Sequence, residues 1–489
     1  MYNFSLKCYK LLFSQLQHYL NVRHQKRFYL FARLLRAVIF PNHDPLYSSG
    51  NFGLTATNRN ADHDDEIPSW LLQEMEAVGL EIDYQIYPDL PTLAKYRFSP
   101  IAIITEPGTE LHYLLAQRKH TRTSHIYILP WLKRGGADKI ALHCINTIAA
   151  DPSKSVSVLI TQTEHSEWLN RLHSSVNLYQ VSTNFRNLDL THQQLVFVTL
   201  LEQLKPDYIH IINSKLALQA LETYGCVVQN IGKVIVHLFC ENHGRGGQLH
   251  GYGSEFLPRI YSHVDRVVTD NHHIINQLKS IYGFPTNLFA VLNTPLMELS
   301  NSGSSTQFTT NKSNTKPRLN VLWAGRMDRQ KRPDLLASIA KRSPQLNFTF
   351  FGISFLDPMP DTFEALIQMP NVTYGGQYDD PSELRFCNYD VYLYTSQWDG
   401  LPVALLEAAQ RKIPIVASDV GGVSELIDSK RGFLIAPFDN VDKYSEALEF
   451  ISINYDEAER RAIALHSYVS IHHSTSQFTA SLYSLYDVL

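Results

Sequence analysis

Short apolar runs alternate with longer stretches of helical periodicity between residues 124 and 437. The runs are rich in Val, Ile and aromatic residues. Continuous apolar strands with helical crossovers are typical of a parallel sheet that helices cover on both faces. The pattern therefore predicts an α/β fold. The predicted strands are HIYILP, VSVLITQ, VNLYQVS, YIHIIN, KVIVHLFC, DRVVTDN, LFAVLN, LNVLWAG, NFTFFG, NVTYGG, YDVYLYTS, IPIVASD and GFLIAP.

Residues 299–318 interrupt this pattern. The stretch LSNSGSSTQFTTNKSNTKPR is rich in Ser, Thr and Asn and almost free of large apolar side chains, which is typical of a linker. It separates two doubly wound, Rossmann-like domains in tandem, residues 119–298 and 319–489, and residues 1–118 form an N-terminal extension. Ligands of such sheets bind beyond the carboxyl ends of the strands, so we expect the site in the cleft across which the two domains face each other.

The predicted extension begins with a basic segment. Residues 1–43 contain seven Lys or Arg residues and no acid, among Leu, Phe and Tyr residues at loosely helical spacing. Such a segment suits contact with an anionic membrane surface. It equally suits a helix that packs on the body of the protein and exposes its basic face. Farther along, SWLLQEMEAVGLEI predicts one helix.

The composition of the 489 residues is that of an ordinary globular protein. The formal net charge of −4 gives no global reason to expect a nucleic acid partner. Five scattered cysteines, never paired as Cys-x-x-Cys, argue against a zinc site or a disulfide framework and fit a reducing cytosol. No apolar stretch approaches the roughly 20 residues of a spanning helix, and no signal peptide is recognisable. A cytoplasmic location is therefore expected.

Two cations follow the first predicted strand of the second domain. In GRMDRQK, Gly325 ends the strand, and Arg326 and Lys331 lie five residues apart around the start of a helix. Cations at a strand-to-helix turn, beside a helix N-terminus, form a clamp for an anion. The alternative is a basic turn that only contacts solvent.

Two acids occur in QWDGLPVALLEAA. Asp399 precedes a Gly-Leu-Pro turn, and Glu407 lies inside the apolar helix that the turn opens, from about Pro402 to Arg411. A ligand rich in hydroxyl groups, such as a ribose, would satisfy Glu407, and Asp399 would reach another part of the same ligand. The alternatives are helix capping by Asp399 and an ion pair between Glu407 and Arg411.

Two glycine pairs stand at similar strand-to-helix turns. Gly421 and Gly422 follow IPIVASD and allow close approach of the backbone. In the first domain, Gly135 and Gly136 follow HIYILP. One glycine pair is a weak signal. The two glycine turns and the turns that carry Arg326 and Asp399 make four strand-to-helix turns at strand ends of two facing domains, and together they predict a ligand site.

These residues match a known pattern. GRMDRQKRPD, WDGLPVALLEAAQRKIPIVASDVGGVSELI and RGFLIAP resemble the retaining glycosyltransferases of the GT-B fold, family four. The resemblance is close over Leu319–Phe450. It is looser but in the same order over Ser124–Leu296, through PWLKRGGADK and HVDRVVTDN. Residues 1–118 lie outside it.

The resemblance implies roles for single residues. Arg326 and Lys331 match the Arg and Lys that hold the donor's diphosphate. Glu407 matches the acid that binds the nucleotide ribose. Asp399 matches the acid near the donor sugar, where the family usually has a Glu, one methylene longer. The other residues assigned to the donor are Gly135, Gly136, Gly400, Leu401, Pro402 and Val403.

The family often has a histidine at a strand end of the first domain, near the reacting sugar carbon. His237, in KVIVHLFCENHG, is the candidate for this catalytic position together with Asp399, and His243 is the rival. A buried core histidine is the alternative for His237.

The resemblance implies a glycosyltransferase of the hexosyltransferase type. It would move a sugar from a nucleotide sugar to a glycan or lipid-linked acceptor, with retained anomeric configuration, in bacterial surface polysaccharide synthesis. No cofactor is expected, and no Asp-x-Asp metal motif stands where it would line the cleft. Two other classes share the architecture: sugar-nucleotide epimerases, which lack the acid-x7-acid stretch in this form, and non-catalytic proteins that bind a nucleotide sugar.

Overall fold

The computed structural model divides into two compact units, Met1–Pro100 and Ile101–Leu489. In the first unit, helix α3 (Ser69–Glu81) confirms the helix predicted over SWLLQEMEAVGLEI. The basic segment 1–43 lies outside the described residues, as does most of the predicted linker. The structure describes residues 69–81, 87, 105–119, 122–244, 246–296, 316, 318–352, 359–378 and 381–488.

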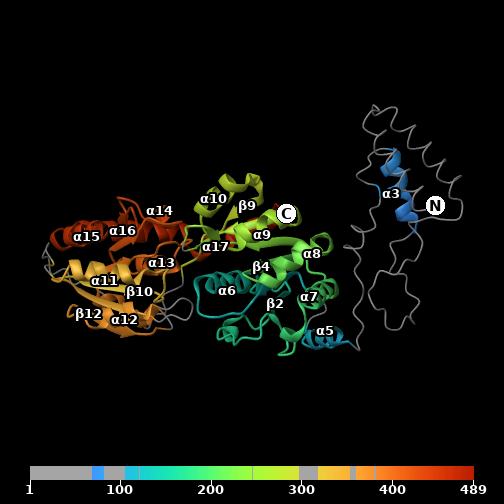
Figure 1. Ribbon diagram of the computed structural model, residues 1–489, viewed down its shortest axis with the longest axis horizontal. Coiled ribbons are helices and arrows are strands. Elements are labelled where there is room, and N and C mark those ends of the chain that lie inside the picture. The colour runs from blue at the N-terminus through green and yellow to red at the C-terminus, as the bar shows by residue number, and fades with distance from the viewer. Residues whose placement is uncertain are drawn as a thin grey trace, which may run out of the picture. The chain divides into compact units, whose positions relative to one another are not determined.

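The second unit contains two parallel sheets (Figure 1), and every predicted strand is present in them. The first domain is built on a 7-stranded sheet in the order β3-β2-β1-β4-β5-β8-β9. Its central strands are buried on both faces, which explains their continuous apolar sequence. The strands are β1 (His125–Leu129), β2 (Val156–Ile160), β3 (Asn177–Gln180), β4 (Tyr208–Ile212), β5 (Lys233–His237), β8 (Arg266–Thr269) and β9 (Phe289–Val291).

The second domain is built on a 6-stranded parallel sheet in the order β12-β11-β10-β13-β14-β15. Both sheets run outward in two directions from the pair formed by their first and fourth strands. Ligands of doubly wound folds bind where the strand order reverses. The turns after β1, β10 and β13 are therefore placed for a site. The strands are β10 (Asn320–Ala324), β11 (Asn347–Phe351), β12 (Val372–Gly376), β13 (Val391–Tyr394), β14 (Ile415–Ser418) and β15 (Phe433–Ile435).

Helices connect the strands and cover the sheets, and their ends follow local chemistry. Helix α10 begins where the Asn271 side chain accepts the Ile274 N–H, and it ends at Gly283, with φ of +71°. The helices are α5 (Glu106–Ala116), α6 (Gly136–Ala149), α7 (Leu190–Leu204), α8 (Lys215–Ile231), α9 (Tyr252–Ile260), α10 (His272–Tyr282), α11 (Pro333–Arg342), α12 (Pro360–Ile367), α13 (Val403–Gln410), α14 (Val423–Leu426), α15 (Val441–Ile453), α16 (Tyr455–His472) and α17 (Thr475–Asp487).

Two predicted domain boundaries do not coincide with the packing. Helix α5 lies inside the predicted extension 1–118, but it packs on the first domain, where Glu110 accepts the Ser182 N–H at 2.8 Å. Helix α17 lies inside the predicted second domain 319–489, yet Phe478 and Leu482 belong to the core of the first domain. Figure 1 shows α17 beside the first sheet. The chain therefore returns to the first domain at its end.

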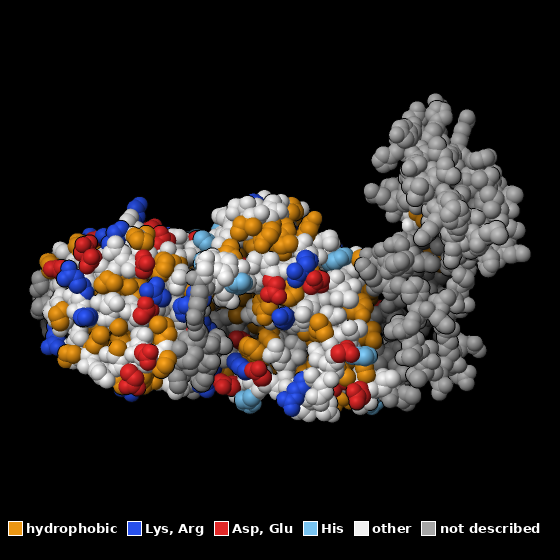
Figure 2. Space-filling view, in the orientation of Figure 1, with side chains coloured by type: hydrophobic (Ala, Val, Ile, Leu, Met, Phe, Trp, Pro, Cys, Tyr) orange, Lys and Arg blue, Asp and Glu red, His pale blue; other side chains and the backbone are white. Residues whose placement is uncertain are grey.

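The face in Figure 2 carries acidic and basic side chains in mixture, and hydrophobic side chains gather over α10. In α10 and in the segment before it, the side chains of Tyr261, Ile281 and Tyr282 are well exposed. The two tyrosine rings each lie 5.5 Å from the ring of Phe284, which is 7% exposed. Tyr261 and Tyr282 therefore shield the Phe284 ring from solvent, which accounts for their own exposure. In the described part of the chain, no helix has the length and apolar character needed to cross a membrane.

Candidate functional site

The turn between β13 and α13 touches the first domain. Helix α13 begins after Pro402, which is its N-cap. A Cβ at Gly400 would lie 2.5 Å from the carbonyl oxygen of Phe239, just beyond β5. Only glycine fits such an approach of one backbone to another. The carboxyl ends of strands from both sheets therefore meet at this turn, which is where the sequence places the site.

Asp399 binds Lys331. The Lys331 ammonium and the Tyr394 hydroxyl donate to Asp399 Oδ2, and the Gly400 N–H donates to Oδ1 at 3.1 Å. Burial alone would raise the pKa of Asp399, but the Lys331 charge and these hydrogen bonds outweigh it and hold the pKa below its usual value. Asp399 is therefore ionised. The capping explanation is wrong, because Pro402 is the N-cap and carries no cap hydrogen bond.

Arg326 and Lys331 lie on one loop after β10, as predicted. Asp328, which sequence reasoning missed, organises that loop: it is 3% exposed, pairs with Arg326 Nε at 2.7 Å and accepts the Lys331 N–H at 3.1 Å. Arg326 also donates to Gln330. A buried carboxylate thus fixes the positions from which both cations project, so the loop is suited to hold an anion.

Glu407 pairs with Lys139 of α6, across the junction of the domains. Both side chains are largely buried, with 13% and 15% exposed. Arg411, the partner weighed from the sequence, donates to the backbone carbonyl of Glu407 at 2.9 Å. An ion pair in such surroundings costs both charges their hydration, so a ligand that takes over Glu407 must replace the Lys139 contact. Lys139 is a second residue that sequence reasoning missed.

The glycine turn of the first domain lies at the start of α13. Gly135 is the N-cap of α6, and a Cβ at Gly136 would lie 3.5 Å from the Val403 side chain. The amino ends of α6 and α13 therefore approach each other, and two helix amino ends attract the same negative charge. Of the residues that the sequence assigns to the donor, Gly136 and Val403 therefore lie side by side.

The second glycine pair also lies against the first domain. A Cβ at Gly422 would lie 2.7 Å from the Cβ of Asn271. Next to it, the Glu425 carboxylate accepts the N–H groups of His272 and His273 at 3.0 and 2.9 Å, which caps α10 from the other domain. The turn therefore holds the two domains together.

A substitution of Gly421 tests how closely the backbone of this glycine turn approaches the Asp399 turn. Its φ is +55°, and a Cβ would lie 1.8 Å from the Asp399 carbonyl oxygen. We expect Gly421→Ala to lower the apparent Tm clearly more than Gly283→Ala, a control with φ of +71° and no atom within 4 Å of the added Cβ. Both changes carry the left-handed strain of about 1–2 kcal/mol, and only the first adds a clash. Thermal unfolding of both variants measures this, and equal losses would contradict the packing.

The two candidate histidines have different surroundings. His237 ends β5 and is 1% exposed, and burial lowers its pKa to about 3. Its Nε2 lies 3.0 Å from His210 Nδ1. His243, in the short hairpin of β6 (Asn242–His243) and β7 (Leu249–His250), stacks on Trp398 at a ring distance of 5.5 Å. His243 thus contacts Trp398, the residue that precedes Asp399 in the sequence, whereas His237 lies in the core of the first sheet.

Asp270 is a buried carboxyl group that sequence reasoning also missed. It follows β8, is 4% exposed and accepts the Asn271 side-chain N–H at 2.6 Å. Burial, with the nearby charge of Asp399, raises the pKa of Asp270 to about 7, although the Asn271 hydrogen bond opposes the shift. Two carboxyl groups whose pKa values are shifted in opposite directions therefore share this junction.

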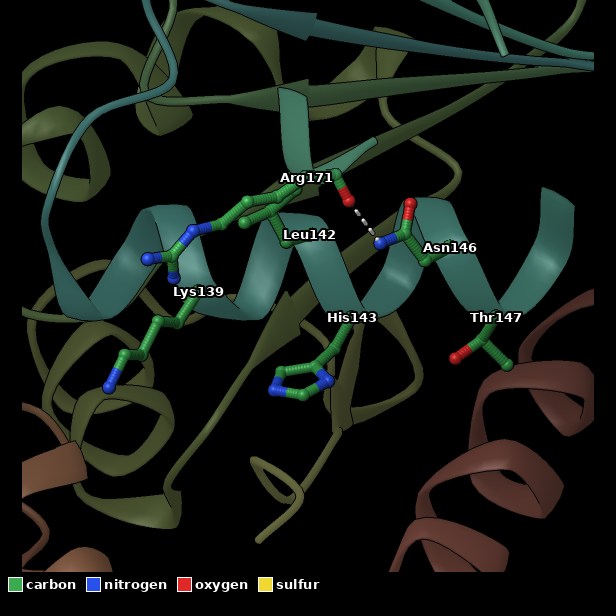
Figure 3. A pocket seen from close by; sticks show the side chains of 6 residues that line it. All are labelled: Lys139, Leu142, His143, Asn146, Thr147 and Arg171. Carbon is green, nitrogen blue, oxygen red and sulfur yellow. Dashed lines mark hydrogen bonds between the residues drawn. The ribbon is translucent and has the colours of Figure 1, made fainter. Parts of the chain in front are cut away.

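A cavity of about 340 Å³ runs along α6. Figure 3 shows Lys139 and the Arg171 guanidinium at one end of it, with His143, Asn146 and Thr147 farther along the helix. Burial, then the Lys139 charge, lowers the pKa of His143 to about 4. The lining thus offers two cations and neutral polar groups. Because Lys139 also binds Glu407, the cavity borders the position predicted for the ribose.

In the described residues, no cluster of three or more His, Cys, Asp or Glu side chains is arranged to hold a metal ion. The expectation of transfer without a metal stays a prediction.

Comparison with known proteins agrees with this architecture. Residues 305–464 match the family model of glycosyl transferases group 1. The chain is 29% identical over 143 residues to the O-antigen biosynthesis glycosyltransferase WbnH of Escherichia coli, which is 29% of this chain and 40% of that protein. It is 29% identical over 148 residues to an uncharacterized 41.2 kDa protein in the cps region of Klebsiella pneumoniae, which is 30% of this chain and 40% of that protein. The matched segment therefore spans less than half of these curated relatives.

The solved structures match over both domains. The structure of Anabaena Alr3699/HepE in complex with UDP and glucose has a TM-score of 0.58 and 14% sequence identity, over 75% of this chain and 100% of that one. TarM has a TM-score of 0.59 and 11% identity, over 75% and 98%. The predicted fold and the resemblance to glycosyltransferases of the GT-B fold are confirmed, while the assignment to family four stays a prediction.

Proposed function

We propose that this chain is a retaining glycosyltransferase that moves a sugar from a nucleotide sugar to a glycan or lipid-linked acceptor, without a metal, in bacterial surface polysaccharide synthesis. One observation carries the proposal: the residues assigned to the donor come from both domains and converge at one junction. Arg326 and Lys331 lie on one loop, and Gly136 lies against Val403 at the start of α13. WbnH, which is named for O-antigen biosynthesis, supports the acceptor class.

In this proposal, the donor diphosphate binds between the two helix amino ends and the two cations. Negative charge grows on the leaving phosphate as the glycosidic bond breaks, so these groups stabilise the transition state more than the ground state. The ribose hydroxyl groups bind Glu407, and the transferred sugar lies beside Asp399. The acceptor approaches from the first domain.

The test is a panel of nucleotide sugars added to the purified full chain. Thermal shift identifies the donor that binds, and product analysis by NMR then separates transfer or hydrolysis with retention from epimer formation. Activity that persists in excess chelator supports transfer without a metal. An epimerised donor would instead establish the epimerase alternative, and binding of a nucleotide sugar without any turnover would favour the non-catalytic alternative.

We also propose that the basic segment 1–43 attaches the enzyme to the cytoplasmic face of an anionic membrane. Each cation near such a surface contributes up to about 1 kcal/mol, and the segment has seven cations and no acid. Deleting residues 1–37 is expected to abolish most co-sedimentation with phosphatidylglycerol vesicles, and neutral phosphatidylcholine vesicles serve as the control. Unchanged co-sedimentation with the anionic vesicles would show that the segment packs elsewhere.

A further inference from the structure

The cavity along α6 shares one cation with the position assigned to the ribose. Six residues line the cavity: Lys139, Leu142, His143, Asn146, Thr147 and Arg171. A small hollow next to it also includes Lys139 and His143, and it continues to Glu407 of α13. Because Lys139 pairs with Glu407, this lysine borders both the cavity and the ribose position. A ligand in the cavity therefore acts on Glu407 through a single side chain.

Arg171 is the second cation of the cavity, and two contacts fix its position. The Asn146 side chain of α6 donates to the Arg171 carbonyl oxygen at 2.9 Å and accepts the His173 N–H at 2.8 Å. The Arg171 guanidinium lies over the Trp168 ring, 4.4 Å from its centroid, and Trp168 is 4% exposed. Among the described residues, no carboxylate pairs with Arg171. A guanidinium that is held in place without an acid partner is suited to bind an anion.

The rest of the lining suits a small organic molecule that carries a phosphate group. None of the six lining residues is acidic, and the two cations lie at one end of the cavity, with neutral polar side chains farther along α6 (Figure 3). Burial, then the Lys139 charge, lowers the pKa of His143 to about 4, so this ring is neutral and offers one donor and one acceptor. The volume of about 340 Å³ lies at the lower end of the range for small-molecule sites.

The pair of Lys139 and Glu407 couples the cavity to donor binding. Both side chains are largely buried, so either charge is unfavourable without a partner. A ribose that binds Glu407 takes the carboxylate away from Lys139, and an anion that attracts Lys139 takes the cation away from Glu407. When both ligands are bound, each charge has a new partner. Each ligand therefore favours the binding of the other.

We propose that this cavity is a regulatory site for a small soluble phosphomonoester, which binds Arg171, draws Lys139 away from Glu407 and so strengthens the binding of the donor. The phosphate group contacts the two cations, and the polar remainder of the ligand lies along α6. The binding of the phosphate group rests on the cavity alone, whereas its effect on the donor rests on the proposed function.

Glycerol 3-phosphate is the probe for the cavity, and its binding to the purified full chain is measured by calorimetry at constant ionic strength, with glycerol as the uncharged control. Saturating nucleoside diphosphate occupies Arg326 and Lys331, so that the probe reports on the cavity. We expect the wild type to bind the probe and Arg171→Gln to bind it about 10-fold more weakly, the lower end for a lost charge-assisted hydrogen bond, because Arg171 is exposed.

Arg186→Gln is the matched control for the loss of one exposed arginine. Arg186 lies on the next short helix, η3 (Phe185–Asn187), and does not line the cavity. This variant should bind glycerol 3-phosphate as the wild type does. Equal binding to the wild type and Arg171→Gln, or no binding to the wild type, would overturn the site.

The effect on the donor has a sign that competition cannot produce. A phosphomonoester that competes for Arg326 and Lys331 weakens the binding of the nucleoside diphosphate. Occupancy of the cavity should instead tighten it, by about 5-fold in the wild type, the lower end of allosteric couplings. Without the probe, Arg171→Gln should bind the nucleoside diphosphate as the wild type does, and adding the probe should no longer tighten it. Lys139→Met should lose the response as well.

The outcomes separate the coupling from the proposed function. If the probe changes nucleoside diphosphate affinity equally in the wild type and Arg171→Gln, the coupling is overturned. If the wild type binds no nucleoside diphosphate, the proposed function fails. The comparison of Arg171→Gln with Arg186→Gln, made without the nucleotide, then still decides whether the cavity binds a phosphate group.

Discussion

Lys331→Met is expected to lower kcat/KM for sugar transfer by about 10²- to 10³-fold, the loss typical of one removed group that stabilises developing negative charge. The Lys331 ammonium lies at the carboxyl end of the second sheet, on the loop that Asp328 holds. In the proposed reaction it contacts the leaving phosphate, on which charge grows. Arg326→Ala should weaken transfer for the same reason. Steady-state kinetics with the donor identified by the panel gives the measurement.

The structure shows how to separate this effect from a loss of stability. Lys331 pairs with Asp399, whose side chain is 17% exposed, so Lys331→Met leaves a largely buried carboxylate without its cation and is expected to lower the apparent Tm. The double variant Lys331→Met/Asp399→Asn removes both charges, and its apparent Tm should recover while transfer stays lost. Lys233→Met, at the amino end of β5 and paired with Asp265, is the control for the substitution itself. Near-normal turnover in Lys331→Met would refute the diphosphate assignment.

Much of this architecture follows from the sequence because of how parallel sheets are built. A strand such as β1 is buried on both faces, so its sequence is apolar throughout and visible without any partner. The carboxyl ends of all strands in one sheet lie at one edge, so Arg326, Lys331 and Asp399 could be placed together from their order alone. The glycines could be found because a close backbone approach excludes every other side chain.

The partners across the domain junction could not be found in this way. Lys139 lies in an ordinary amphipathic helix, and its partner Glu407 is 268 residues away. Asp270 and His210 each lie in an apolar strand region, where the local pattern only indicates burial. The last helix, α17, has the pattern of any helix that covers a sheet, and nothing in it shows which of the two sheets that is. These features depend on tertiary contacts, which periodicity does not encode.

Substitutions of the two acids, Asp399 and Glu407, are expected to impair the enzyme in different ways. Glu407 is assigned to the ribose, which is far from the bond that breaks and is held equally in the ground and transition states. Such uniform binding changes KM more than kcat. Glu407→Gln keeps the size of the side chain but weakens its acceptance of hydroxyl protons. We expect about 10-fold weaker binding of the bare nucleoside diphosphate, because a hydrogen bond to a charged group contributes about 1.5–3 kcal/mol.

Lys139 provides the control that the Glu407 variant needs. Glu407→Gln leaves the Lys139 ammonium without its carboxylate at a position that is 15% exposed, and this alone can lower stability. Lys139→Met removes the cation that competes with the ribose for Glu407, so nucleoside diphosphate binding should be at least as tight as in the wild type. If Lys139→Met weakens binding as much as Glu407→Gln does, the pair itself, and not a ribose contact, holds the site together.

Asp399 is assigned to the transferred sugar, so Asp399→Asn should leave nucleoside diphosphate affinity within about 2-fold and lower kcat instead, as expected for a contact that strengthens in the transition state. Its pKa is held low by Lys331, Tyr394 and the Gly400 N–H against the effect of burial, so the wild-type group is a carboxylate that an amide cannot replace. Calorimetry with the nucleoside diphosphate and kinetics with the donor measure the two effects. Asp399→Glu, which restores the length usual in the family, should be active only if the sugar leaves room for one more methylene. Lost nucleoside diphosphate binding in Asp399→Asn, together with normal binding in Glu407→Gln, would mean that the two roles are reversed.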